Sequence, residues 1–350
     1  DVISEQTKIE NIPGQLYKSY GKHTFFNSGA LVMGCGANDH KIIGEYNLNT
    51  ILKPEPVEFS SVYDTGQNHV TIIDEGNNIY VRGSNKWGQC GIEDINETYS
   101  HIDLKLTENI EITDVKCGKE HTIIKLSGGT VMTWGYNLRG QIGDGTHNNR
   151  YEPYAVKGMT NITQIAAGNN HTVALDANGN VWRWGDNSYG QFGNGSTVSS
   201  NSPINNYYGD LEHKNISSGS NHILYVDKDG KLFTKGDNTY GQLGTSDNVS
   251  REDFAEVHGP WGSKKIVKAE TCADTSFVLT EDNKVYGWGR NDKYQLHDNT
   301  NIDKNVPILI AIAVIDVAAG LEHVIALAKN GEVMAWGDNT YGQIILDSIS

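Results

Sequence analysis

Seven positions, spaced 46 to 53 residues apart, carry the side chains in this sequence that are best suited to chemistry. Six are histidines and the sixth position holds a threonine; in order they are His23, His69, His121, His171, His222, Thr275 and His323. Imidazole nitrogens bind zinc or act as general acids and bases. Side chains that recur once per repeat are spread through a structure and do not converge on one ion. We therefore predict that each histidine hydrogen-bonds the backbone near the following turn, with the adjacent threonine paired to it.

The other candidate sites in the sequence also favour a structural role. Asp227-Lys-Asp-Gly230 begins like a calcium loop, but the twelfth position is Asn238 instead of glutamate. The four cysteines have no Cys-x-x-Cys spacing and are predicted to pack in the core: Cys35, Cys90, Cys117 and Cys272. Gly-x-Ser-x-Gly, phosphate-loop and His-Glu-x-x-His motifs are absent from the sequence. We predict no catalytic residues, no metal site, no cofactor and no enzymatic activity.

The repeat that carries the histidines reads as short β-strands. In the fourth copy, Ile162 to Ala167, Thr172 to Leu175 and Val181 to Trp184 are predicted strands, and a fourth is expected near Pro203-Ile204. Asn178-Gly179 joins the second strand to the third, and such a step tolerates the positive φ of a tight hairpin. A four-stranded unit of about fifty residues is typical of a propeller blade.

The two ends of the chain predict how the ring closes. The last copy stops seven residues after Gln343, before its fourth strand. Lys8 to Ile12 stands where a fourth strand would precede the first copy. We expect this N-terminal strand to complete the last blade, which removes a free sheet edge.

The pattern Gly-x-x-His-Thr followed by Trp-Gly-x-Asn-x-x-Gly-Gln-x-Gly resembles the RCC1 repeat (regulator of chromosome condensation 1), and it spans nearly the whole chain. The resemblance implies an all-β, seven-bladed β-propeller with four-stranded blades, forming a single domain over residues 1–350. Cys35, Arg82 and Lys235 replace the repeat's tryptophan in three copies.

Two activities known in this family fit the sequence poorly. Exchange factors for the small GTPase Ran carry an inserted β-wedge, whereas the intervals between copies here are short. Plant ultraviolet photoreceptors place tryptophans in the Gly-x-x-His-Thr turn, whereas this chain has polar pairs such as Asn169-Asn170.

The charge and hydropathy of the chain limit the kinds of partner that it is expected to bind. The formal net charge is −15, from 28 Lys and Arg against 43 Asp and Glu, and no basic stripe is present. Nucleic-acid binding is therefore not expected, and an acidic surface favours a basic protein partner. No apolar stretch reaches the roughly 18 residues of a membrane-spanning helix, so membrane insertion is not expected.

The loop between Trp-Gly-x-Asn and Gly-Gln lies at the same end of every predicted blade and carries aromatic residues of the kind that anchor interfaces. Four aromatic residues depart from the repeat and are the predicted partner-binding residues: Trp87, Tyr207, Tyr208 and Trp261.

We predict a non-enzymatic, protein-binding scaffold that uses a loop face of the propeller. A first alternative is a secreted, surface or virion-associated module that binds glycans or a host receptor, favoured by loops rich in Asn, Ser, Thr and aromatic residues. A second alternative is a regulator of a small GTPase, either as a Ran-type exchange factor or as an effector.

Overall fold

The computed structural model describes residues 2–9, 23–28, 31–37, 50–57, 63–74, 76–94, 98–104, 106, 109–205 and 213–344. In these ranges all regular elements are β-strands, arranged in six four-stranded antiparallel sheets and one three-stranded sheet. The first two four-stranded sheets comprise β5 (Tyr63–Thr65), β6 (His69–Ile73), β7 (Ile79–Gly83) and β8 (Thr98–Ile102), then β9 (Ile112–Cys117), β10 (His121–Leu126), β11 (Val131–Gly135) and β12 (Arg150–Ala155). The next two comprise β13 (Ile162–Ala167), β14 (His171–Asp176), β15 (Val181–Gly185) and β16 (Ser200–Asn205), then β17 (His213–Ser218), β18 (His222–Asp227), β19 (Leu232–Gly236) and β20 (Arg251–Val257). The last two comprise β21 (Ile266–Cys272), β22 (Thr275–Thr280), β23 (Lys284–Gly289) and β24 (Lys304–Ile312), then β25 (Val314–Ala319), β26 (His323–Ala328), β27 (Val333–Asp338) and β1 (Val2–Ile9). The three-stranded sheet comprises β2 (His23–Ser28), β3 (Leu31–Ala37) and β4 (Thr50–Val57).

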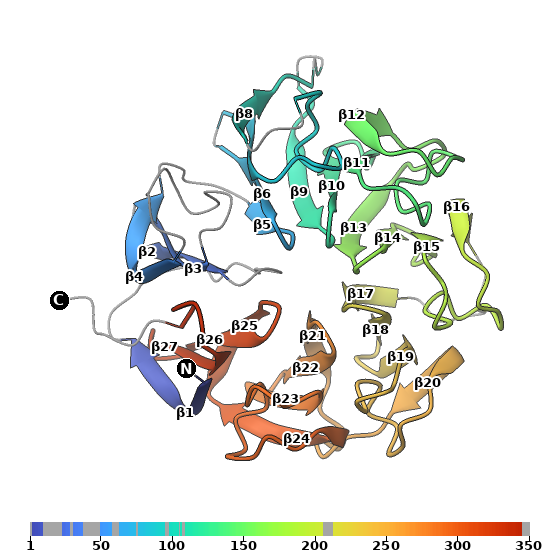
Figure 1. The fold of residues 1–350 in the computed structure, drawn as a ribbon. Coiled ribbons are helices and arrows are strands. Elements are labelled where there is room, and N and C mark those ends of the chain that lie inside the picture. The colour runs from blue at the N-terminus through green and yellow to red at the C-terminus, as the bar shows by residue number, and fades with distance from the viewer. Residues whose placement is uncertain are drawn as a thin grey trace.

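The sheets stand side by side around a common centre, as the blades of a propeller (Figure 1). Inner strands such as β13, β17 and β21 face the centre, and outer strands such as β16, β20 and β24 lie at the outer edge of the ring. This arrangement confirms an all-β propeller with four-stranded blades. The predicted count of seven such blades is not confirmed, because six sheets have four described strands and the β2-β3-β4 sheet has three.

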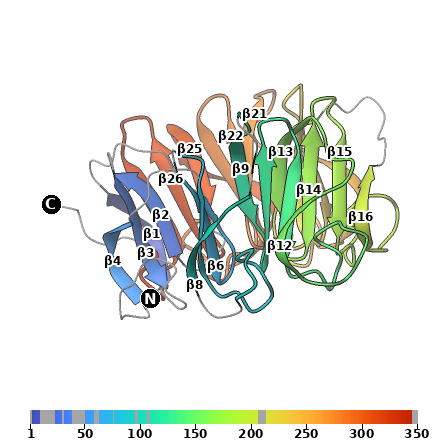
Figure 2. The ribbon, with the colours of Figure 1, turned by 90° about the horizontal axis from the view of Figure 1, so that it is seen from above.

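The local sequence explains why a repeat such as the fourth forms four strands joined by turns. The predicted strands of the fourth copy are β13, β14, β15 and β16, and the second strand, β14, is buried along its whole length. Gly179 adopts a φ of 81° in the β14–β15 hairpin, a left-handed conformation that favours glycine. The strands stand upright in the ring, so their turns gather at its two ends (Figure 2).

The N-terminal strand joins the last blade. β1 pairs antiparallel with β27, with Lys8 opposite Met334 and Ile9 opposite Val333. The closure was predicted correctly, but the strand begins earlier than the predicted Lys8 to Ile12 segment. The pairing gives the outer edge of β27 a partner and joins the two ends of the chain.

The apolar core lies between neighbouring blades. Between the last two repeats, for example, Phe277 and Leu279 of β22 belong to the same buried cluster as Val317 of β25 and Trp336 of β27. The cysteines are buried with free thiols, as the packing role predicted. Each blade is therefore stabilised by burial against the next.

Candidate functional site

The recurrent histidines lie at the junctions between blades. His69 Nε2 is 2.9 Å from the hydroxyl of Thr122 in the next blade, and His121 Nε2 is 3.2 Å from that of Thr172. The Thr122 hydroxyl donates to the Gln89 carbonyl at 3.0 Å. Because a hydroxyl has one hydrogen, it must accept from the histidine N–H. The predicted partner was therefore wrong: the histidine bonds a hydroxyl of the next blade instead of backbone near its own turn.

Burial keeps these imidazoles neutral. It lowers the pKa of His69 and His121 to about 3 and that of His171 and His323 to about 4. A general base for reactions near neutral pH needs access to its substrate and a pKa near the working pH. These buried rings have neither and hold the blades together.

The repeat's tryptophan completes the same junction. Trp134 Nε1 donates to the Gln89 carbonyl at 3.0 Å, and Trp336 Nε1 donates to the Gln295 carbonyl at 2.7 Å. The glutamine carbonyl of one blade thus receives a hydroxyl or an indole donor from the next. A structural role for the repeat signature follows directly from this bonding.

One junction carries cations where the repeat has an indole. Lys235, which replaces the tryptophan, is fully buried, donates to the Phe192 carbonyl at 2.8 Å and lies 4.0 Å from the centre of the Phe254 ring. Arg183 is also buried and donates to the same carbonyl. Burial, followed by the charge of Arg183, lowers the pKa of the Lys235 ammonium well below its usual value. This pair is enclosed in the protein and offers no surface to a ligand.

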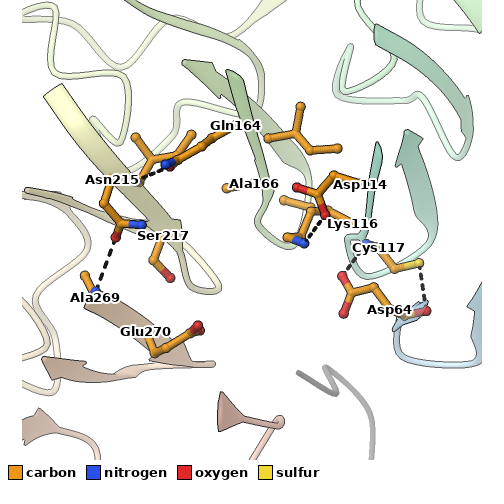
Figure 3. Close-up of a pocket in the computed structure, with 13 residues that line it drawn as sticks. Asp64, Asp114, Lys116, Cys117, Gln164, Ala166, Asn215, Ser217, Ala269 and Glu270 are labelled. Atoms are coloured by element: carbon orange, nitrogen blue, oxygen red, sulfur yellow. Dashed lines mark hydrogen bonds and ion pairs between the residues drawn. The ribbon is translucent and has the colours of Figure 1, made fainter. Parts of the chain in front are cut away.

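A cavity of about 190 Å³ lies between the inner strands at the centre of the ring (Figure 3). Asp64, Asp114 and Lys116 lie on one side, and Asn215, Ser217 and Glu270 lie on the other. This pocket was not predicted from the sequence, since its residues share no motif and are brought together by ring closure alone.

Most polar groups of the pocket bond one another or the next blade. Lys116 Nζ is 2.6 Å from Asp114 Oδ1, and Asp64 accepts the Cys117 N–H at 2.8 Å. Asn215 Oδ1 accepts the Ala269 N–H at 3.2 Å. The Lys116–Asp114 pair lies within β9, whereas the Asp64 bond joins β5 to β9 and the Asn215 bond joins β17 to β21. The bonds between adjacent inner strands give the pocket a structural function.

The pocket has no activated nucleophile among its described residues. Burial, and then the charge of Asp64, raises the pKa of the Cys117 thiol well above its usual value, so the reactive thiolate is suppressed. Burial acts to lower the pKa of Lys116, but Asp114, Asp64 and Glu270 together raise it, which keeps the amine protonated. Neither group is suited to covalent catalysis.

Two opposite ends of the blades are open to partners. We call loop face the end that carries the turn before each histidine and the loop after each third strand; the two are joined by backbone bonds such as Asp186 N to Asn170 O at 2.8 Å. We call hairpin face the other end, which carries the turns between second and third strands, such as Asp176 to Gly179.

The loop face repeats an exposed aliphatic residue on three consecutive blades. Val198, Val249 and Ile302 are 72%, 60% and 62% exposed. An asparagine side chain holds the carbonyl of each one, at 3.1 to 3.3 Å. Leu138 and Tyr189 are exposed in the neighbouring loops of the same face. The aliphatic positions were not among the predicted binding residues, although their spacing of just over fifty residues was a readable signal.

The four predicted partner-binding residues do not form one cluster. Trp87 lies half-buried on the loop face, with its ring 5.4 Å from that of Tyr136. Trp261 follows β20 at the hairpin end, where it is half-buried and packs edge-on against Tyr286 at 5.5 Å. Tyr207 and Tyr208 lie outside the described residues.

The described residues contain neither a cluster of metal-binding side chains nor a helix suited to cross a membrane. No group of three or more His, Cys, Asp or Glu side chains is placed to hold a metal ion in the ranges given above. The same part of the chain has no helix of the length and apolar character needed to cross a membrane.

This chain is similar in sequence to several known proteins. The chain is 26% identical over 343 residues to the ultraviolet-B receptor UVR8 of Arabidopsis thaliana, covering 91% of this chain and 75% of UVR8. It is 35% identical over 277 residues to the probable E3 ubiquitin-protein ligase HERC4 of Homo sapiens, covering 77% of this chain and 26% of that protein. The chain therefore spans about a quarter of the ligase's length.

A solved structure and a protein family also match this chain. The crystal structure of Prp20p from Saccharomyces cerevisiae superposes with a TM-score of 0.77 at 23% identity, covering 93% of this chain and 83% of that one, and so shares the propeller fold. The RCC1-like domain family matches residues 97–348, which is most of the chain. Together with the propeller of four-stranded blades and the repeated junction of histidine, hydroxyl and glutamine carbonyl, this match shows that the protein belongs to the RCC1-like domain family.

Proposed function

We propose that this protein is a non-enzymatic interaction module that binds another protein through its loop face. The observation that carries the proposal is the exposure of Val198, Val249 and Ile302 on consecutive blades of that face. Exposed aliphatic groups that recur at one place in adjacent repeats form a patch, and such patches mark interaction sites. The asparagine bonds hold only the backbone carbonyls of these three residues, so they do not account for the apolar side chains.

Relatives of this chain support an interaction role. The yeast propeller Prp20p is described by its binding to Gsp1p and histones. For this protein we propose a protein partner on the same general grounds, without assigning its identity. Trp87 is proposed as a further anchor on the loop face, because it combines a large ring with partial exposure. Trp261, Tyr207 and Tyr208 remain predictions.

The proposed architecture is a single seven-bladed ring over residues 1–350, in which the β2-β3-β4 sheet is the remaining blade. The support is its place in the ring between the β1-containing blade and the β5–β8 blade (Figure 1). A closed, rigid ring holds loops from different blades at fixed positions, which favours binding without loss of conformational entropy.

Affinity capture with matched variants tests the proposal. The bait is the full chain, applied to lysate or medium of the native source, and the test variant is V198S/V249S/I302S. The control, V267S/I312S/I315S, removes three aliphatic side chains that are also exposed, at 54%, 63% and 48%, on the hairpin face. We expect wild type and control to retain the same protein and the loop-face variant to lose it. Equal retention by all three proteins would contradict the proposed face.

A further inference from the structure

The loop face carries negative charge beside its aliphatic patch. Asp237, Asp274, Asp292, Glu322 and Asp338, here named the acidic rim, come from three consecutive blades. They act on one another: after burial, the charges of Asp338 and Asp292 raise the pKa of Glu322. Burial is likewise the main cause of the raised pKa of Asp274, and the charges of Asp237 and Asp292 also raise it.

Two cations lie within this group. Arg290 Nη2 is 2.7 Å from Asp292, and Arg290 Nη1 is 3.8 Å from Asp274. Lys293 is the second, and it acts to lower the pKa of Glu322. Asp274, Asp292 and Glu322 reach the surface, whereas Asp237 and Asp338 are buried and accept bonds within their own loops. With the two cations, the surface groups sum to a charge of −1, and the two buried carboxylates bring the total to −3 when all are ionised.

Asparagine side chains connect the acidic rim to the aliphatic residues of the loop face. Asn238 follows Asp237 in the chain, and its side chain donates to the Val249 carbonyl at 3.2 Å. Asn291 precedes Asp292 and donates to the Ile302 carbonyl at 3.3 Å. Each of these two loops thus holds an exposed aliphatic side chain close in the chain to a rim carboxylate, which is exposed at Asp292 and buried at Asp237.

The two loops are also joined to each other. The Asn305 side chain donates to Asn248 Oδ1 at 3.1 Å, and Ser246 N donates to the Asn305 carbonyl at 2.9 Å. Val249 and Ile302 therefore belong to one continuous surface that borders the rim. An incoming segment can contact both features without any movement of the blades.

We propose that this part of the loop face binds an extended segment of a partner protein that is rich in lysine and arginine and carries interspersed large aliphatic residues. The inference rests on the proposed function and adds the chemistry of the partner. Basic side chains would lie over the acidic rim, and aliphatic ones would pack on Val249 and Ile302. Charge complementarity selects this occupant, because the rim repels nucleic acids and anionic lipid surfaces.

A labelled peptide tests the partner chemistry directly. The probe is a fluorescein-labelled 16-residue peptide of eight Lys, four Leu and four Gly, and fluorescence anisotropy at low salt measures its Kd for the full chain. The test variant, D274N/E322Q, neutralises two half-buried rim carboxylates and keeps their shape. The control, E111Q/E281Q, removes the same charge from exposed positions on the hairpin face.

We expect the rim variant to weaken probe binding by about tenfold and the control by less than about twofold, since nearby charges dominate in salt solution. Raising the salt should weaken wild-type binding more than it weakens binding by the rim variant. A probe with glutamate in place of lysine should not bind. Melting temperatures of both variants within a few degrees of wild type exclude unfolding.

Three results would overturn the inference: equal losses in the rim and control variants, tighter binding of the glutamate probe, or preferential binding of a labelled single-stranded oligonucleotide. Partner capture separates this inference from the proposed function. Suppose that V198S/V249S/I302S loses the captured protein and D274N/E322Q retains it in full. The proposed interaction face would then be supported, and the proposed basic segment would be refuted.

Discussion

Acidification should weaken the fold in a pH range where few other groups titrate. The change is a shift from pH 7.5 to pH 5.5. Histidine has an ordinary pKa of about 6.5, so the unfolded chain takes up protons over this range. In the folded ring, His69 and His121 have a pKa of about 3, and His171 and His323 of about 4, because burial penalises the charged imidazole.

The sign and size of the effect follow from proton linkage. The unfolded state binds more protons than the folded state, so the free energy of unfolding falls as the pH falls through 6.5. Each of these histidines contributes a loss of about 1.4 kcal/mol between the two pH values, and the four together about 5 to 6 kcal/mol. Burial also lowers the pKa of His213 to about 4, which adds a further loss of about 1 kcal/mol. Total stabilities of about 5 to 15 kcal/mol are usual, so the loss is a large fraction of the whole.

Urea unfolding followed by tryptophan fluorescence measures this loss. The matched variant is H121T, because the chain itself places Thr275 at the equivalent position of another blade. At pH 7.5 this variant should lose about 1 to 3 kcal/mol with its inter-blade bond. Its further loss on acidification should be smaller than that of wild type by about 1.4 kcal/mol.

Two outcomes would refute the reasoning. One is a wild-type loss below about 2 kcal/mol over this range, which would mean that the imidazoles are hydrated or protonated in the fold. The other is an unchanged pH dependence in H121T. Low-pKa carboxylates such as Asp144 and Asp298 titrate at lower pH and do not account for a loss above pH 5.5.

Three other predictions concern stability. K235M should be neutral or stabilising by about 1 kcal/mol in urea unfolding, because Lys235 is a fully buried amine whose desolvation is costly and the Phe192 carbonyl keeps a second donor; a loss above about 2 kcal/mol would contradict this. W134F should cost about 1 kcal/mol more than W184F, because the Trp134 indole makes a 3.0 Å bond and the Trp184 Nε1 has no hydrogen-bond partner among the described residues; equal losses would show that the indole bond contributes nothing. Deletion of residues 1–9 should lower the melting temperature and promote association, since it exposes the edge of β27; an unchanged monomer with the wild-type melting temperature would argue against closure by β1.

The repeat in the amino-acid sequence was enough to determine the propeller architecture. Strand positions such as Ile162 to Ala167 follow from apolar patterning and from glycine steps such as Gly179, both of which act over a few residues. Closure by the N-terminal strand was also predictable, because the last copy lacks one strand and the first is preceded by one. The boundary of β1 was shifted, since pairing with β27 and not local sequence fixes where that strand lies.

Tertiary structure decided what each repeated residue contacts. The partner of His69 is Thr122, 53 positions away, and only the packing of one blade on the next brings them together. The central pocket likewise joins Asp64 to Glu270 through ring closure. Exposure of Val198, Val249 and Ile302 depends on loops held by asparagine side chains, so the same aliphatic residue type that builds the core elsewhere forms a surface here. The repeat in the sequence specifies which residues form strands and turns. It does not specify which strands of neighbouring blades come into contact, because that depends on how the blades pack in space.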